Sequence, residues 1–225
     1  MKIAALLQIG RGVTAIIGGG GKTTLMEVLA GELSQKGSVI LMTTTHIRRP
    51  AQLETLTDAD EALVSAALSR SRIVCVGEAA EEGKLRAPRL SIETLARLAD
   101  FVLVEADGSR QLPLKAHAAH EPVVPPCSRQ VICVVGMSGL HRPVREAVHR
   151  PELFCPLAGC NPEDEVTAEL VARGLLREGL ADTVFLNQAE SDSVLQDAAV
   201  IASRLKLEGL RVVCGSQRQQ QYKVL

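Results

Sequence analysis

Ile16-Ile17-Gly18-Gly19-Gly20-Gly21-Lys22-Thr23-Thr24 is the stretch that decides the fold of this chain. The β-branched run Val13–Ile17 predicts a strand that ends at the glycines. Leucines at positions 25, 29 and 33 then follow at helical spacing, and Gly37 stops the pattern. A glycine-rich turn between a strand and a helix is typical of loops that bind phosphate groups. The stretch therefore predicts an α/β protein with a phosphate-binding loop.

The chemistry of this loop follows from its residue types. Glycines have no Cβ, so successive backbone N–H groups can face one concavity, and the following helix adds its positive N-terminal end. A lysine here would reach the terminal phosphates and assist catalysis, and the first threonine hydroxyl would bind Mg²⁺. Mg²⁺ with ATP or GTP is thus the expected cofactor. The residues that we expect to contact it are Gly18, Gly19, Gly20, Gly21, Lys22, Thr23 and Thr24.

Two other interpretations of the loop stay open at this level: a dinucleotide-binding fingerprint and a glycine-rich turn that binds no ligand. The full phosphate-loop pattern has a glycine where this chain has Ile16, so the loop is two residues short, as in the Mur ligases. A dinucleotide fingerprint would need Gly or Ala in place of Thr23, and an acid on the second strand, which instead ends Thr43-Thr44-Thr45-His46. A ligand-free turn would leave Lys22 buried without an anion.

A second constellation follows the apolar run Phe101–Val104. Glu105 and Asp107 come next, and strand alternation predicts that both point the same way, roughly 6–7 Å apart. Two carboxylates at the carboxyl edge of a parallel sheet can hold Mg²⁺ or its waters beside a triphosphate. We therefore expect both to be catalytic and to bind the metal together with Thr23. The alternative is that one acid only caps a turn at Asp107-Gly108.

Asn187-Gln188-Ala189-Glu190 ends a later strand, where G-type nucleotidases carry Asn-Lys-x-Asp. The pattern predicts contact of Asn187 with the nucleotide base. Glu190 is one methylene longer than the aspartate of that pattern, so we expect little discrimination between ATP and GTP. The alternative is an ordinary helix cap at Asn187 or Ser191.

Short apolar runs alternate with helical patterns along the chain, which predicts a mostly parallel sheet with helices on both faces. No linker is evident, so residues 1–225 are expected to form a single nucleotide-binding domain. Glu78 to Pro88 is polar and predicts a loop or hairpin. The expected strands are 13–17, 39–42, 73–76, 101–104, 131–135, 183–186 and 211–213, and the expected helices lie near 58–69, 91–98, 166–177 and 193–205.

Composition excludes several classes of protein. The chain is 46% hydrophobic and 23% charged, as ordinary globular proteins are, and its net charge of −1 favours neither nucleic acid nor an anionic membrane. Six cysteines without a CxxC pair indicate thiols in a reducing cytosol. The apolar run Ile3–Ile9 lacks a cleavage site, so we interpret it as mature protein and expect a cytoplasmic location without a membrane span.

A set of segments spread along the chain forms a more specific pattern than the glycine loop alone: Gly18–Thr24, Thr43–His46, Glu105–Ser109, Leu114–Ala116, His120–Pro125, Val148–Glu152 and Asn187–Ala189. Together these segments resemble the selenium-dependent hydroxylase accessory protein family. They appear in the family's order and span most of the chain. One departure is His117, where the family tends to have proline, and it concerns only the rigidity of a local loop.

The resemblance implies an accessory factor that binds, and hydrolyses, a nucleoside triphosphate during maturation of a selenium-dependent molybdenum hydroxylase. Its partners would then be the triphosphate and a molybdenum hydroxylase or the proteins that assemble its cofactor. Two alternatives come from the loop itself. One is a small-molecule kinase or acyl-phosphate ligase with a Mur-like short loop, and the other is a nucleotide sensor without catalysis.

A few further residues carry open alternatives. His117 and His120 suit either a metal site or a hydrogen-bonded loop, and Cys155 and Cys160 suit either soft-metal or selenium-related sulfur chemistry or simple burial. Two cations are candidates for an anion or for solvent, Lys115 and Arg150.

Overall fold

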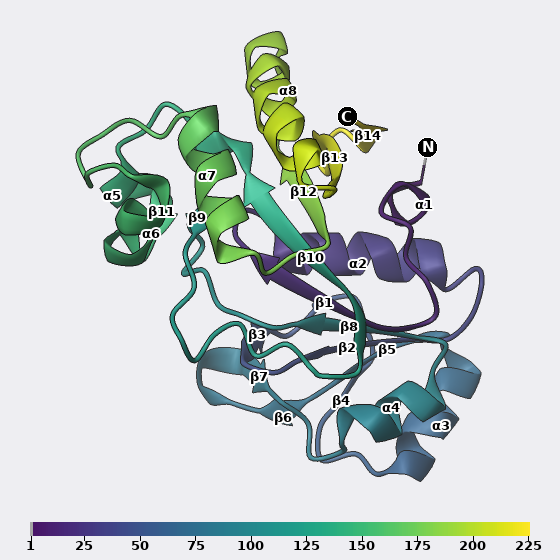
Figure 1. Cartoon of the computed structure of the whole chain (residues 1–225). Coiled ribbons are helices and arrows are strands. Elements are labelled where there is room, and N and C mark those ends of the chain that lie inside the picture. The colour runs from purple at the N-terminus through teal and green to yellow at the C-terminus, as the bar shows by residue number, and fades with distance from the viewer. Residues whose placement is uncertain (1) are drawn as a thin grey trace.

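The computed structural model describes residues 2–225. Its centre is a nine-stranded sheet in the order β14-β13-β12-β10-β1-β8-β2-β5-β4 (Figure 1). All neighbouring pairs are parallel except β13 and β14. The prediction of a mostly parallel sheet is confirmed. The strands are β1 (Gly12–Gly18), β2 (Val39–Thr43), β4 (Thr55–Leu56), β5 (Ile73–Val76), β8 (Phe101–Glu105), β10 (Ser128–Gly136), β12 (Thr183–Asn187), β13 (Arg211–Ser216) and β14 (Gln221–Val224).

Eight α-helices are distributed along the described chain. Four of them begin at a polar N-cap residue whose side chain accepts a hydrogen bond from a backbone N–H group of the first turn. These N-cap residues are Asp60, Ser91, Thr167 and Ser191. The cap expected at Asn187 or Ser191 is therefore Ser191. The helices are α1 (Ile3–Leu6), α2 (Lys22–Leu33), α3 (Glu61–Arg70), α4 (Ile92–Leu98), α5 (Val144–Ala147), α6 (Pro151–Ala158), α7 (Ala168–Glu178) and α8 (Asp192–Leu207).

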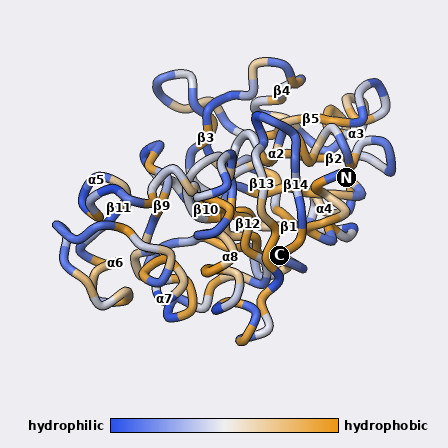
Figure 2. The backbone as a smooth tube through the Cα atoms, turned by 90° about the horizontal axis from the view of Figure 1, so that it is seen from above, coloured by the Kyte–Doolittle hydropathy of each residue, from blue (hydrophilic) through white to orange (hydrophobic). Residues whose placement is uncertain are grey.

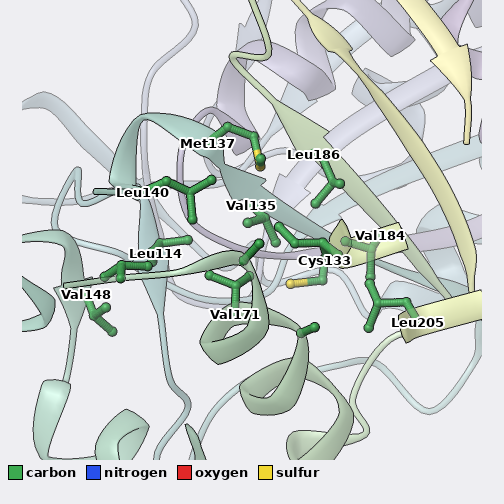
Figure 3. Packing of buried hydrophobic residues seen from close by; sticks show 14 of the residues in the cluster. Leu114, Cys133, Val135, Met137, Leu140, Val148, Val171, Val184, Leu186 and Leu205 are labelled. Carbon is green, nitrogen blue, oxygen red and sulfur yellow. The ribbon is translucent and has the colours of Figure 1, made fainter. Parts of the chain in front are cut away.

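Helices cover both faces of the sheet, because successive strand side chains alternate between them. On one face α1 and α2 pack against strand residues such as Ile16 and Leu103. On the other face α3 and α4 cover the half that contains β2 and β5, and α6, α7 and α8 cover the half that contains β10 and β12. Figure 3 shows the second half, with Val135 and Val184 facing Val171. Seen from above, polar colouring marks many of the outer loops (Figure 2).

Two small sheets flank the carboxyl edge of the large one. The segment predicted as a loop or hairpin is a hairpin of β6 (Glu78–Ala79) and β7 (Lys84–Arg86), and β3 (His46–Arg48) pairs with β7. The other small sheet pairs β9 (Leu114–Lys115) with β11 (Val148–His149) in parallel. These short strands bring residues from distant parts of the chain to the end of β1.

The apolar N-terminal run contains the short helix α1. Ile3, Leu6 and Leu7 are buried in the same core cluster as α2. The two carboxylate oxygens of Glu32 accept the backbone N–H groups of Ile3 and Ala4 at 3.1 and 2.8 Å, which satisfies the start of the helix. Within residues 2–225, none of the helices has both the length and the apolar character needed to cross a membrane.

Candidate nucleotide and magnesium site

The glycine loop joins β1 to α2 in a conformation that side chains cannot adopt. Gly18, Gly20 and Gly21 have φ values of 92°, 82° and 121°. A Cβ added to Gly18 would lie 2.3 Å from the Val134 carbonyl oxygen, and one added to Gly20 would lie 2.3 Å from the Gly136 Cα. Both obstacles are backbone atoms of β10, which cannot move away cheaply. The glycines are therefore required by the close approach of loop and sheet.

Only part of the loop backbone faces outward. Gly18 N donates to Asp107 Oδ2 at 2.9 Å, and Gly19 N donates to the Val134 carbonyl at 2.9 Å. The expectation that all four glycine amides face one concavity is therefore wrong for the first two, because the sheet and the acid behind it use them. The amides of Gly20, Gly21 and Lys22 donate to no other residue within 2–225. They lie at the N-terminus of α2, where an anion is stabilised.

Lys22 lies between the two predicted acids. Its side chain is only 4% exposed, and its Nζ donates to the Gly18 carbonyl at 2.7 Å. The same Nζ lies 3.1 Å from Asp107 Oδ1 and 3.7 Å from Glu105 Oε1. The structure thus brings all three predicted catalytic groups together. The Lys22 ammonium therefore has three acceptors inside the protein, and the residue also lines the cavity at the loop.

Glu105 and Thr23 meet at the mouth of the site. β8 ends at Glu105, and the Thr23 hydroxyl donates to Glu105 Oε2 at 2.9 Å. Both residues line a cavity of about 500 Å³, together with Lys22 and Thr24. Burial raises the pKa of Glu105, and Lys22 and Thr23 oppose that shift. A carboxylate beside a threonine hydroxyl supplies the oxygen ligands that Mg²⁺ takes in triphosphate sites, so these residues fit the metal.

Asp107 lies behind the loop. It is fully buried, does not line the cavity, and its Oδ2 accepts from Gly18 N and pairs with His117 Nε2 at 2.7 Å. Burial alone would raise the pKa of Asp107, but the hydrogen bond to His117 and the charges of Lys22 and Lys115 outweigh it and lower the pKa to about 2. Asp107 is thus an ionised anchor for the loop. Its direct contact with Mg²⁺ remains a prediction.

A buried network extends from Asp107 to the end of α7 and to Arg150, the N-cap residue of α6. His117 Nδ1 lies 3.0 Å from Glu178 Oε2 at the end of α7, and the His117 backbone N–H donates to Glu178 Oε1 at 2.7 Å. Lys115 Nζ lies 3.2 Å from Asp107 Oδ2 and 2.6 Å from Glu121 Oε2, and Arg150 binds the same Glu121 oxygen at 2.5 Å. Lys115 and Arg150 are therefore paired within the protein.

The two histidines that suggested a metal site behave differently. His117 is committed to two carboxylates, as described above, and His120 is exposed. In the part of the chain that the structure describes, no three His, Cys, Asp or Glu residues come together as a metal site. The structure supports the alternative of a hydrogen-bonded loop for this segment.

Asn187 supports the loop from the side of β12. Its Nδ2 donates to the Gly20 carbonyl at 2.8 Å and to Gln217 Oε1 at 2.9 Å, and its Oδ1 accepts from Gln217 N at 3.3 Å. Glu190 accepts from the Ser216 hydroxyl at 2.7 Å. Contact between Asn187 and a base therefore stays a prediction, because its amide is already in use. Gln217 was missed, since it belongs to a polar tract that carries no sequence signal.

The outer wall of the cavity is basic. His46, Arg48 and Lys84 come from the small sheet of β3 and β7, and Arg110 comes from the loop after β8. Lys84 pairs with Glu82 at 2.6 Å, whereas neither arginine forms an ion pair within residues 2–225. The sequence did not single out these two arginines. Their side chains are available to an anion.

Comparison with known proteins places this site in a family. The sequence profile described as YqeC protein matches residues 14–152, which is more than half of the chain. The chain belongs to the YqeC family. The matched region contains the glycine loop, both acids and Arg150, but it ends before Asn187.

One relative of known sequence adds to this assignment. The uncharacterized protein YqeC of Escherichia coli (strain K12) is 36% identical over 160 residues, which are 67% of this chain and 62% of that protein. The chain thus spans 62% of the length of the curated relative that it matches.

Two solved structures show weaker likeness to this YqeC-family chain. The signal recognition particle 54 kDa protein of Aeropyrum pernix K1, in complex with GDP, gives a TM-score of 0.42 at 14% identity and covers 96% of this chain and 44% of that one. The GTPase PAB0955 of Pyrococcus abyssi, in apo form, gives 0.45 at 14% identity, with 93% and 92% covered. Because both TM-scores are below 0.5, the phosphate-loop assignment rests on β1, the glycine loop and α2 themselves.

Proposed function

We propose that this YqeC-family chain binds and hydrolyses a nucleoside triphosphate with Mg²⁺ at the glycine loop. The observation that carries the proposal is the convergence of Lys22, Thr23 and Glu105 beside one cavity at the carboxyl edge of β1 and β8. A bound Mg²⁺ would offset negative charge on the phosphoryl group that is transferred. ATP and GTP are both candidates for the nucleotide.

Each residue has a distinct role in this proposal. Lys22 turns from the carboxylates to the terminal phosphates, and the free amides of Gly20 and Gly21 hold phosphate oxygens. Thr23 and Glu105 hold the metal or its waters. Asp107 keeps its charge and fixes the loop through Gly18 N.

For the cellular role, we propose an accessory factor in the maturation of a selenium-dependent molybdenum hydroxylase. Segments that resemble that family lie side by side around the site: Val123 N donates to the Ala106 carbonyl at 2.9 Å, and the Thr44 hydroxyl donates to the Val123 carbonyl at 2.8 Å. We place this activity in one α/β domain in the cytoplasm. The hydroxylase, or the proteins that assemble its cofactor, would be the partner.

A second candidate function is transfer of the phosphoryl group to an anionic small molecule. Arg48 and Arg110, which have no ion-pair partner in residues 2–225, favour it, because they line the same cavity as Lys22. Guanidinium groups bind carboxylates and phosphates with paired hydrogen bonds. An acceptor held there would lie beside the terminal phosphate.

Calorimetric titration with ATP, GTP and CTP, with and without Mg²⁺, tests the nucleotide site. Phosphate release in the same buffers then separates hydrolysis from simple binding. Slow release without any acceptor supports the hydrolase, whereas release that requires an added carboxylate or phosphate ester supports the second candidate. Absence of binding by all three nucleotides contradicts both.

Deletion of the gene tests the cellular role, in a host that makes a selenium-dependent molybdenum hydroxylase. We expect the hydroxylase to accumulate without its labile selenium, and wild-type protein to restore it. The Lys22→Ala variant should not restore it. Normal selenium content in the deletion strain would contradict the accessory role and leave nucleotide binding untouched.

A further inference from the structure

Cys155 and Cys160 lie on either side of the C-terminal end of α6. α6 ends at Ala158, and Gly159 follows in the left-handed conformation with φ 71° and ψ 54°. Cys160 N then donates to the Cys155 carbonyl at 3.1 Å, and Gly159 N donates to the same oxygen at 2.8 Å. A bond from the second residue after the helix back to this carbonyl defines the Schellman motif.

This motif places two particular side chains against each other. The residue that accepts the bond and the residue that donates it usually form an apolar contact across the helix end. Here both positions are cysteines, so the contact is between two thiols. Burial, together with a hydrogen bond to Cys155, raises the pKa of the Cys160 thiol to about 11. Cys160 also packs against the hydrophobic cluster that contains Cys155, so the two side chains lie at the same helix end.

The pair is open to small molecules. Both cysteines line a surface hollow of about 530 Å³ with Glu152, Asn161 and Pro162. Cys160 is partly exposed, and Cys155 is 8% exposed beneath it. The other four cysteines lie elsewhere: Cys75, Cys133 and Cys214 are buried, and Cys127 is exposed. None of these four lines the hollow.

We propose that Cys155 and Cys160 are a dithiol site that closes reversibly to an intramolecular disulfide. The oxidant is a low-molecular-weight disulfide such as oxidised glutathione. The partly exposed Cys160 thiolate attacks one sulfur of the oxidant, forms a mixed disulfide and releases one small thiolate. The Cys155 thiolate then attacks Cys160 Sγ and releases the second small thiolate. The oxidant gains two electrons, and the two cysteine protons pass to solvent.

The thiol chemistry sets the conditions of the reaction. Only a small fraction of a thiol with a raised pKa is thiolate at neutral pH, and the thiolate is the nucleophile. The closing rate should therefore rise about tenfold for each pH unit between pH 7 and pH 9. The site uses none of the residues that we assign to the nucleotide.

The test uses the full chain with Cys127→Ser, which removes the exposed thiol outside the hollow. The protein is incubated with oxidised glutathione without oxygen at pH 7, 8 and 9, then analysed by intact mass and peptide mapping. We expect loss of the mass of two hydrogens and a peptide that links 155 to 160. Dithiothreitol should reverse both changes.

Two further variants assign the steps. In Cys155→Ser the glutathione adduct on Cys160 should persist, because the resolving thiol is gone, and in Cys160→Ser modification should nearly disappear. Cys155→Ala replaces the serine variant if circular dichroism shows that the latter is unfolded. A stable glutathione adduct on the parent protein, or a parent that stays reduced at pH 9, would overturn the proposal.

Discussion

Glu105 and Asp107 are two residues apart at the end of β8, and both approach Lys22, yet their surroundings differ. Glu105 opens on the cavity and accepts a hydrogen bond from Thr23. Asp107 is fully buried and takes its hydrogen bonds from the loop backbone and from His117. The same strand end thus supplies one carboxylate to the site and one to the framework that holds it.

The pKa directions of the two groups express this difference. Burial raises the pKa of Glu105, because one lysine and one hydroxyl compensate only part of the desolvation. Burial also acts to raise the pKa of Asp107, but its bond to His117 and the charges of two lysines lower that pKa to about 2. Polar partners, more than burial, set the direction in which each pKa moves. Substitutions that separate stability from nucleotide chemistry can therefore test the comparison.

The largest effect is expected from Lys22→Ala, which removes the cation that both acids share. The free energy of unfolding should fall by about 3 kcal/mol, because two buried carboxylates lose a partner. Triphosphate affinity should fall by about 2–4 kcal/mol as well, since a charge-assisted contact is lost. Denaturant unfolding and calorimetry measure the two effects. The exposed Lys36→Ala is the matched control, and unchanged affinity for every nucleotide would rule out the phosphate loop.

Glu105→Gln should act on turnover rather than on stability. Phosphate release with Mg²⁺ should slow about a hundredfold, because the amide is a weaker metal ligand. The free energy of unfolding should change by less than about 1 kcal/mol, since the amide can still accept from Thr23. Glu93→Gln on α4 is an exposed control. Turnover at the wild-type rate would mean that Glu105 is structural.

Asp107→Asn should reverse this pattern. At pH 7 the free energy of unfolding should fall by about 2 kcal/mol, because the pKa of Asp107 is about 2 in the folded chain and the ordinary pKa of an aspartate is about 3.9. An aspartate whose pKa is lower in the folded chain stabilises the folded state at pH values above its pKa in the unfolded chain. That stabilisation is lost as the pH falls through its pKa in the folded chain. The gap between wild type and variant should therefore shrink to about half near pH 3. A gap that is independent of pH would argue against an ionised anchor.

The smallest effect is expected from Asn187→Ala. The loop loses two hydrogen bonds from one amide, so affinity for ATP and for GTP should fall together by about 1 kcal/mol. The two nucleotides should stay within about tenfold of each other in both proteins. Competition titrations with ATP and GTP measure this. A preference above a hundredfold that vanishes in the variant would restore Asn187 to the base pocket.

The features that the sequence predicted depend on residues close together in the chain. The buried strands, the glycine loop and the acid-bearing end of β8 are local patterns, and the structure confirms the sheet that they imply. The partners of Asp107 and Asn187 could not be predicted in this way. His117 bridges to Glu178 across 61 positions, and Gln217 reaches Asn187 across 30. Helix α6 was missed because Pro151 and Pro156 hide its pattern.

The position of Lys22 between two acids also has a thermodynamic consequence under the proposed function. The Lys22 ammonium partly neutralises Glu105 and Asp107, and it must leave them to reach a phosphate. A divalent cation beside Glu105 would take over that neutralisation and release Lys22. Metal and triphosphate should therefore bind cooperatively, with a coupling free energy of about 1–3 kcal/mol. Because such coupling is reciprocal, the nucleotide would raise the affinity for Mg²⁺ by the same factor, and each ligand alone would bind less tightly than in the presence of the other.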